Sequence, residues 1–343
     1  GRQALQANIS AGRYFLYIGA LRSFLARYAP DFPENHINHL CSGEPDMRSR
    51  QMIEGIQQLA KVAAEDPQLA AKLNAQAPGG YSELLASLPI EHPFSRALTD
   101  FLSTYGHRCV REIELATPRW REDPATVLQM VRNYLQEDLQ IATDRHSLHL
   151  LARDALRQAL PRRWQQRLAL YLVRRVRYYV TLREDTRHYH TMAFATVRGK
   201  LMNLGLQLVQ DERLRVQEDV FFLSWAEADA LSRGELDWMD VAGRVRQRRR
   251  LNQSLSRQRP PETIHIADME ATSDGTSDEQ TGSQELKGHC ASPGTAEGPV
   301  RIITDPTTAA HLAPGDILVA PYTDPAWTPL FPIAAAVVVE VGS

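Results

Sequence analysis

Apolar residues recur at intervals of three and four positions over most of the chain, from residue 1 to about 257. This spacing gathers apolar side chains on one face of an α-helix. One such stripe ends before Pro30 and consists of Leu16, Ala20, Leu21, Phe24, Leu25 and Tyr28. Another lies on a helix predicted from Trp164 to about Leu204 and consists of Leu168, Leu172, Val176 and Tyr179. The pattern therefore predicts a large domain made mostly of helices.

The pattern changes near the C-terminus. Residues 268–285 carry six acidic side chains and no basic ones, a composition typical of a flexible linker. Beyond them, β-branched runs alternate with Gly and Pro, which predicts strands within 292–303, 314–321 and 334–341. We therefore expect a mainly α fold with a small, incomplete β-rich domain at the C-terminus. The predicted boundaries are a helical domain over 1–265, an acidic linker over 266–285 and the β-rich part over 286–343.

The composition is that of an ordinary soluble protein, with 43% hydrophobic and 23% charged residues, which excludes disordered, collagen-like and coiled-coil classes. Spanning a bilayer takes about 20 consecutive apolar residues, and the chain has no such run. Its three cysteines are too scattered for a disulfide framework, which favours the cytoplasm. Because the chain begins without Met and ends just after an apolar strand, we expect it to be a piece of a longer protein.

A formal charge of −2 gives no overall attraction to nucleic acid or membrane, but residues 153–200 hold twelve basic and three acidic side chains. Within this stretch Arg183 and Arg187 continue the helical spacing of the apolar positions up to Tyr179. Two guanidinium groups therefore fall on a face that is apolar upstream. Because burying unpaired charge is costly, they need anionic partners or a wet cleft.

The C-terminal part carries the most specific motifs. Its segments 288–300 (GHCASPGTAEGPV), 312–320 (LAPGDILVA) and 322–329 (YTDPAWTP) resemble the swivelling phosphohistidine domain of the phosphoenolpyruvate-utilising enzymes. In that family, the strand matching Val337–Val341 leads to a Gly-rich turn and a Ser-His pair whose His carries the phosphoryl group. The chain stops at Gly342–Ser343, so this His is not in the chain, and His289 lies at the wrong place to replace it. We expect the fragment alone to be inactive.

A second block, Tyr105–Pro124, resembles the GHRG and PRW motifs in the acceptor-binding domain of rifampicin phosphotransferase-like proteins. Cys109 stands where that family usually has Gly, and Gly tolerates a positive φ that Cys does not. We expect His107 and Arg108 to pair with Glu112 or Glu114 inside the helical domain. Phosphoenolpyruvate synthase and the dikinases have no comparable helical domain before the swivel, so the layout favours the branch that acts on a small organic acceptor.

The segment 183–187 (REDTR) resembles the family's Arg-Glu-x-x-Lys segment, whose two cations face the phosphohistidine during transfer. The resemblance implies that Arg183 and Arg187 neutralise charge on the transferring phosphoryl group. Arg187 stands where Lys is common, and its planar guanidinium has a different geometry from an ammonium. The alternative is a structural salt bridge with Glu184, Asp185 or Glu114.

Aromatic side chains near the arginine pair suit a pocket for a flat acceptor, although core packing is the alternative. The candidate substrate-binding residues are Tyr171, Tyr179, His190 and Phe194, with His190 able to act as a base on an acceptor hydroxyl. No metal site is predicted, because the paired histidines lack the third ligand and the carboxylate or Cys support that zinc requires.

The run Arg244–Arg250 suggests nucleic-acid binding as a rival class. No recognition motif accompanies it, and basic side chains are favoured near a helix C-terminus by the helix dipole. We therefore interpret it as the charged end of the last helix and predict neither a nucleic-acid partner nor a membrane partner.

The resemblance implies a fragment of an ATP-dependent, dikinase-type phosphotransferase. A missing ATP-grasp domain would use ATP and Mg²⁺, bound outside this chain, to charge the missing His, with release of AMP and phosphate. The partners would be the small-molecule acceptor, the ATP-grasp domain and the rest of the swivelling domain. Three alternatives remain: a ligase of the prodiginine-condensing type, a phosphoenolpyruvate synthase-like enzyme, and a non-catalytic helical interaction module.

Overall fold

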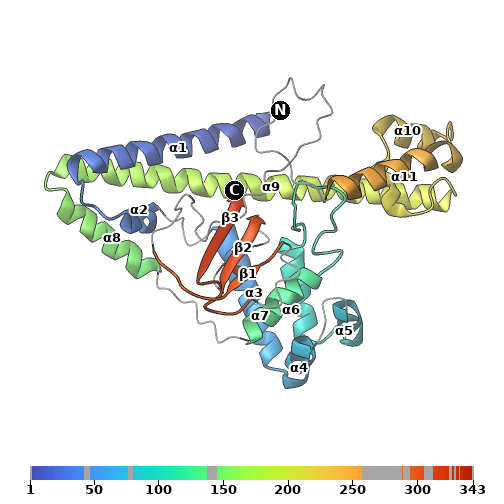
Figure 1. Cartoon of the computed structure of the whole chain (residues 1–343), viewed down its shortest axis with the longest axis horizontal. Coiled ribbons are helices and arrows are strands. Elements are labelled where there is room, and N and C mark those ends of the chain that lie inside the picture. The colour runs from blue at the N-terminus through green and yellow to red at the C-terminus, as the bar shows by residue number, and fades with distance from the viewer. Residues whose placement is uncertain are drawn as a thin grey trace, which may run out of the picture. The chain divides into compact units, whose positions relative to one another are not determined.

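The computed structural model describes residues 2–41, 47–75, 80–136, 145–256, 288, 294–304, 312–323, 327, 330–331 and 333–341. Helices make up most of it and a single small sheet lies near the C-terminus of the described part, so the predicted fold class is confirmed (Figure 1). The predicted linker, 266–285, lies outside the described residues. None of the described helices is long and apolar enough to cross a membrane.

Close contacts divide the chain into two units, residues 1–197 with 293–343 and residues 198–292. The division leaves the predicted domain boundaries untested, so they stay predictions.

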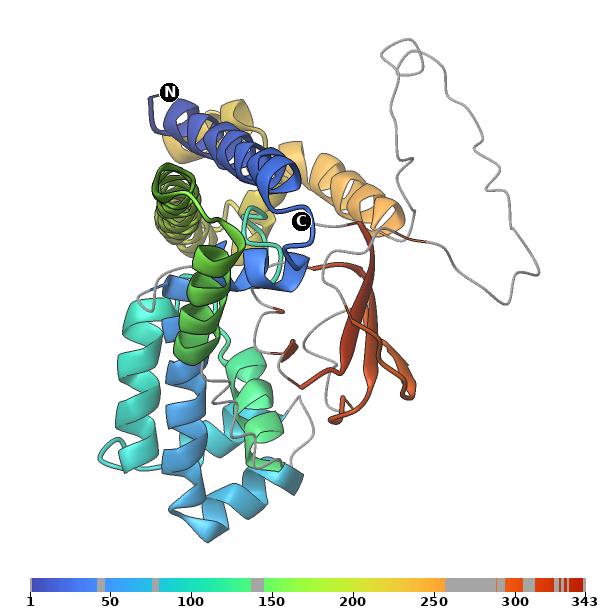
Figure 2. The ribbon, with the colours of Figure 1, turned by 90° about the vertical axis from the view of Figure 1, so that its left-hand side faces the viewer.

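The longest helices of the first unit are α1 (Arg2–Tyr28) and α9 (Arg163–Gln210), and α9 matches the helix predicted from Trp164. The two pack side by side and antiparallel, since Tyr17 stacks on Tyr179 while Tyr28 meets Trp164 edge-on (Figures 1 and 2). Buried side chains from α1, α2 (Glu34–Cys41), α8 (Arg145–Ala159) and α9 share one core. Three members of the predicted stripes, Leu16, Ala20 and Leu168, are exposed. The buried face of α1 instead passes through Ile18, Leu21 and Leu25.

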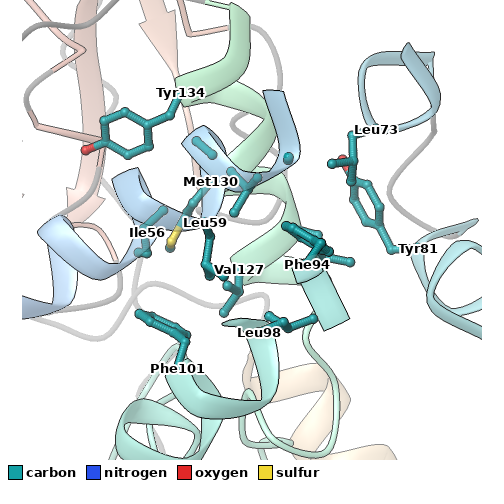
Figure 3. Close-up of a cluster of buried hydrophobic side chains, with 14 of the residues drawn as sticks. Ile56, Leu59, Leu73, Tyr81, Phe94, Leu98, Phe101, Val127, Met130 and Tyr134 are labelled. Atoms are coloured by element: carbon teal, nitrogen blue, oxygen red, sulfur yellow. The ribbon is translucent and has the colours of Figure 1, made fainter. Parts of the chain in front are cut away.

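A second core of this unit joins five shorter helices. They are α3 (Arg48–Ala64), α4 (Pro67–Ala75), α5 (Tyr81–Ser87), α6 (Pro93–Tyr105) and α7 (Ala125–Gln136). Side chains such as Ile56, Phe101 and Val127 point toward one another from α3, α6 and α7 (Figure 3). The loop between α6 and α7, residues 106–124, carries the GHR block, so this core fixes both ends of that loop.

The sheet contains β1 (Val300–Ile302), β2 (Ile317–Tyr322) and β3 (Ala336–Val341), close to where strands were predicted, and their order in the sheet is β1-β2-β3 (Figure 1). Both pairings are parallel, with Val300 opposite Ile317 and Ile317 opposite Ala336. Leu318, Trp327 and Ile333 form its core among the described residues. The sequence indicated the strands, whereas their parallel register depends on pairing between segments far apart in the chain.

The second unit contains the end of α9, a short 3-10 helix η2 (Gln217–Phe222), α10 (Trp225–Arg233) and α11 (Trp238–Leu255). Both α10 and α11 begin with a capping box, in which Ser224 and Asp237 bond the backbone of the first turn. Leu208, Val220, Leu231 and Val241 are among the residues of its core. The basic run 244–250 lies within α11, as predicted, but in the middle of the helix and not at its end, since the last turn holds no basic residue.

Candidate phosphoryl-acceptor site

One face of α9 lines a cavity of about 240 Å³ together with the loop between α6 and α7. The lining residues are Arg183, Thr186, Arg187, His190, Thr191 and Phe194 from the helix, and Glu112 and Ile113 from the loop. Positions three and four apart lie on the same side of an α-helix, which explains why these six helical residues share one face. The structure therefore brings together four of the residues predicted from sequence: Arg183, Arg187, His190 and Phe194.

Glu112 is the centre of an ion cluster, the Glu112 cluster, formed with Arg108 and Arg187. Its buried carboxylate accepts a hydrogen bond from Nη1 of Arg108 at 2.8 Å and another from Nε of Arg187 at 3.1 Å. The predicted pairing of Arg108 with Glu112 is confirmed. His107 was expected to pair with a carboxylate, but its ring instead meets that of His188 edge-on, with centroids 4.6 Å apart.

Arg119 of the PRW motif holds the loop in place. Its buried guanidinium donates to the backbone carbonyl of Glu112 at 3.0 Å and to that of Glu114 at 3.2 Å, and it also contacts Sγ of Cys109. Gly106, at the start of the loop, has no room for a side chain, because a Cβ there would clash with the Leu102 carbonyl oxygen. The motif residues thus fix the backbone of the loop that carries Glu112.

The Gly-to-Cys replacement at Cys109 does not strain the loop. In the described part of the chain, the residues other than glycine with a positive φ are Arg111, at 57°, and Glu212. Cys109 is therefore outside the left-handed region and is compatible with an ordinary side chain. The loop makes its left-handed turn two positions later.

Arg183 and Arg187 differ in how they are held. Arg183 lies over the ring of Tyr14 on α1, 5.5 Å from its centroid, and has no carboxylate partner among the described residues. Arg187 has a half-exposed side chain and pairs with Glu112 through Nε, while its two terminal amino groups have no partner within the described ranges. Both arginines therefore keep hydrogen-bond donors available at the cavity.

The predicted alternative was a structural salt bridge to Glu184, Asp185 or Glu114. Arg187 does form a structural salt bridge, but with Glu112, and the described contacts include none from either arginine to the three predicted partners. Glu184 accepts a hydrogen bond from Oγ of Ser49 at 2.9 Å, and Asp185 accepts one from Nε of Arg48 at 3.3 Å. These two carboxylates extend toward α3 because they follow Arg183 by one and two positions and so lie on another face of α9. Glu114 accepts a hydrogen bond from the backbone N–H of Ala116 within its own loop.

Two predicted substrate-binding residues do not line this cavity. Tyr179 is buried between α1 and α9, where its hydroxyl accepts a hydrogen bond from Arg175 at 2.9 Å. Tyr171 is half exposed and lies twelve positions before Arg183, which corresponds to about 18 Å along a helix. For Tyr179 the geometry favours the core alternative, and a role for Tyr171 in binding the acceptor stays a prediction.

A buried pair of neutral histidines lies beside the cluster. Burial, together with the positive charges of Arg108 and Arg48, lowers the pKa of His188 to about 4. Burial and the neighbouring His188 lower the pKa of His107 to about 3. Both rings are therefore uncharged near neutral pH, so the positive charge at the cavity comes from the arginines. Among the described residues, no three His, Cys, Asp or Glu side chains come together as a metal site.

Two parts of the chain match models of known protein families. Residues 7–184, about half of the chain, match the family model of the rifampicin phosphotransferase fourth domain, and residues 312–343 match the mobile domain of the phosphoenolpyruvate-utilising enzymes. The chain belongs to the rifampicin phosphotransferase-like family of phosphoenolpyruvate-utilising enzymes. Both predicted resemblances are thereby confirmed at the level of the family.

Individual members of this family are similar over most of the chain. The prodigiosin synthesizing transferase PigC of Serratia marcescens is 28% identical over 96% of this chain and 38% of its own length. A rifampicin phosphotransferase of Streptomyces sviceus is 31% identical over 83% of this chain and 33% of its own length. The rifampicin phosphotransferase of Bacillus cereus is 28% identical over 72% of this chain and 29% of its own length. The chain thus spans about a third of the length of these relatives.

Two residues that line the cavity, Glu112 and Ile113, were not predicted from the sequence as site residues. Glu112 was expected only as a structural partner of His107 or Arg108, yet its carboxylate also holds Arg187, 75 positions away in the chain. Ile113 is 77% exposed, and it lines the cavity beside Phe194. The signal available in the sequence was an apolar residue next to a carboxylate within a recognised motif.

Proposed function

We propose that this chain supplies the acceptor-binding part of an ATP-dependent, dikinase-type phosphotransferase, and that the cavity beside Arg183 and Arg187 is where the acceptor receives the phosphoryl group. The observation that carries the proposal is the pair of arginines whose terminal donors are unpaired within the described residues, lining one cavity. Cations with available N–H donors stabilise the charge that develops on a transferring phosphoryl group.

The proposed step moves one phosphoryl group from a histidine to oxygen. ATP with Mg²⁺, both bound outside this chain, charges the histidine of the mobile domain. One phosphoryl group of ATP passes to the histidine, a second passes to water and leaves as inorganic phosphate, and AMP is released. The P–N bond of the phosphohistidine then breaks as a P–O bond forms to an acceptor hydroxyl. Arg183 and Arg187 bind the phosphoryl oxygens, while His190, which lines the cavity, accepts the hydroxyl proton.

The dimensions of the cavity limit what part of the acceptor it holds. Its volume of about 240 Å³ is below the range of about 300–1,000 Å³ usual for drug-sized ligands, so it suits one end of a larger molecule. Ile113 and Phe194 supply apolar walls next to the arginines. We propose an acceptor whose hydroxyl is attached to an apolar or aromatic skeleton that extends out of the cavity.

The test uses the whole protein that contains this chain, incubated with ATP, Mg²⁺ and candidate phenols, pyrroles and planar polyketides. Release of AMP that depends on one acceptor, together with a phosphorylated product, would support the proposal. The signal is expected to be lost in Arg183→Ala and kept in Arg174→Ala, an exposed arginine nine positions earlier on the opposite face of α9. AMP release without dependence on any acceptor would contradict it.

The second candidate is a ligase that uses the phosphoryl group to activate a substrate for condensation. Similarity to a prodigiosin synthesizing transferase over 96% of the chain favours this candidate. The same cavity would then bind a phosphorylated intermediate. The product distinguishes the two: a condensed product without phosphate supports the ligase, and a stable phosphate ester supports the phosphotransferase.

A further inference from the structure

Arg187 contacts Glu112 through only one of its three guanidinium nitrogens. The hydrogen bond runs from Nε to Oε2 of Glu112 at 3.1 Å, and both terminal amino groups lack a partner among the residues that the structure describes. The side chain is 48% exposed, whereas the carboxylate beside it is 2% exposed. One end of the guanidinium is therefore anchored in the protein interior and the other end is available at the cavity.

Glu112 is itself held on several sides. Arg108, also buried, bonds Oε1 at 2.8 Å, and Arg119 bonds the backbone carbonyl of Glu112 at 3.0 Å. A carboxylate fixed in this way cannot follow a partner that moves. The direction of the Glu112 carboxylate therefore sets the direction of the Arg187 guanidinium.

A lysine could not perform both tasks in the same geometry. The planar guanidinium spreads its charge and its five N–H donors over two ends, so it can bond a carboxylate and an anion at once without turning. An ammonium is a compact charge on a flexible stem, and a buried carboxylate nearby attracts it strongly. At position 187 it would pair with Glu112 and bind the phosphoryl group less well.

We propose that Glu112 is a positioning residue that holds Arg187 through Nε, so that both terminal amino groups serve the phosphoryl group and position 187 requires arginine in this chain. The inference rests on the proposed function and adds to it a role for Glu112. It also explains how this chain accommodates arginine where the family commonly has lysine.

A cycle of variants of the whole protein tests the inference. Arg187→Lys is expected to lower kcat for acceptor turnover about tenfold with little change in acceptor KM, because the ammonium pairs with Glu112. In the double variant with Glu112→Gln the neutral amide attracts the ammonium less, so kcat should recover about threefold or more relative to Arg187→Lys alone. Arg174→Lys is the control outside the cavity, and its kcat should match the wild type.

The outcomes are separable. If Arg187→Lys turns over as fast as wild type, or if the double variant is no faster than Arg187→Lys, the positioning role is wrong. If both Arg183→Ala and Arg187→Ala leave phosphoryl transfer unchanged, the proposed function itself fails. Loss of activity in these alanine variants combined with full activity in Arg187→Lys removes only the inference about Glu112.

Chemical rescue gives a readout that does not depend on the folding of a Glu112 variant. In Arg187→Ala, added guanidinium is expected to restore acceptor turnover about fivefold, because it can bridge Glu112 and the phosphoryl group as the side chain does. Methylammonium, a compact cation, is expected to restore clearly less. Equal rescue by the two cations, or no rescue by guanidinium, would overturn the inference.

Discussion

Two clusters in this protein each join one carboxylate to two arginines, and they differ in which guanidinium donors remain available. In the Glu227 cluster, formed by Glu227, Arg244 and Arg248, Arg248 bonds the carboxylate with both terminal amino groups and also donates to the Phe222 carbonyl at 2.8 Å. Arg244 contacts the same carboxylate through Nε at 2.6 Å and is half-exposed, as Arg187 is, so the two clusters differ in Arg248. In the Glu112 cluster, Arg187 uses Nε alone and keeps both terminal amino groups available within the described residues.

The difference shows that charge counts do not identify an anion site. A guanidinium whose terminal donors are bonded within the protein stabilises the fold, whereas one with unsatisfied donors beside a cavity can bind a ligand. Arg249 follows the structural pattern as well, since it pairs with the buried Asp219. Arg248 and Arg249 on α11 thus anchor their own unit, whereas Arg187 on α9 keeps its terminal donors available at the cavity.

The largest expected effect comes from removing one arginine from each cluster. Arg187→Ala is expected to lower acceptor turnover of the whole protein about 100-fold, because a donor to the transferring group is lost. Arg248→Ala should leave kcat within about twofold and instead lower the free energy of unfolding by about 1–3 kcal/mol, since it leaves a buried carboxylate less well paired. Steady-state kinetics and denaturant unfolding of both variants measure the contrast. If Arg187→Ala and Arg248→Ala lowered kcat equally, the proposed difference in function between the two clusters would be wrong.

Acid should weaken the Glu227 cluster within a defined range of pH. The hydrogen bond from Arg248 lowers the pKa of Glu227 from 4.5 to about 2. Because the pKa is lower in the folded state, this stabilisation is complete above about pH 4.5 and is lost as the pH falls toward about 2. Glu227→Gln is expected to remove up to about 2 kcal/mol at neutral pH and to flatten this part of the stability profile, measured by denaturant unfolding. A wild-type profile that matches the Gln variant would argue against the assignment.

The smallest expected effect concerns two exposed apolar residues, one in each unit. Ile113 is 77% exposed at the cavity and Met239 is 79% exposed on α11. Ile113→Ser should raise the acceptor KM about threefold, because it removes an apolar contact with the bound acceptor and little buried surface. Met239→Ser should leave KM unchanged. A similar KM for both variants would place the acceptor away from Ile113.

The sequence predicted those parts of the site that depend on local periodicity. Helical spacing placed Arg183 and Arg187 on the face that continues from Val176 and Tyr179, and α9 has them there. The same spacing brings in His190 and Phe194. Family motifs located the loop between α6 and α7. The division into a helical part and a small β-rich part followed from composition and turn residues.

The sequence could not predict contacts that depend on tertiary packing. Nothing local indicates that Glu112 meets Arg187, because the loop is brought to α9 by the packing of other helices. The same holds for Ser49 and Arg48 on α3, which take up Glu184 and Asp185 and so leave the two arginines without them. Tyr179 is covered by the ring of Tyr17 on α1, which is a contact between residues far apart in the sequence.

The central claim is that Arg183 and Arg187 stabilise the phosphoryl group while it passes from the phosphohistidine to the acceptor. The most direct measurement follows a labelled phosphohistidine in the whole protein through a single turnover after acceptor is added. In the variant with both Arg183→Ala and Arg187→Ala, the histidine should acquire the label as in wild type, and the label should pass to the acceptor about 100-fold more slowly. Transfer to the acceptor at the wild-type rate would contradict the account.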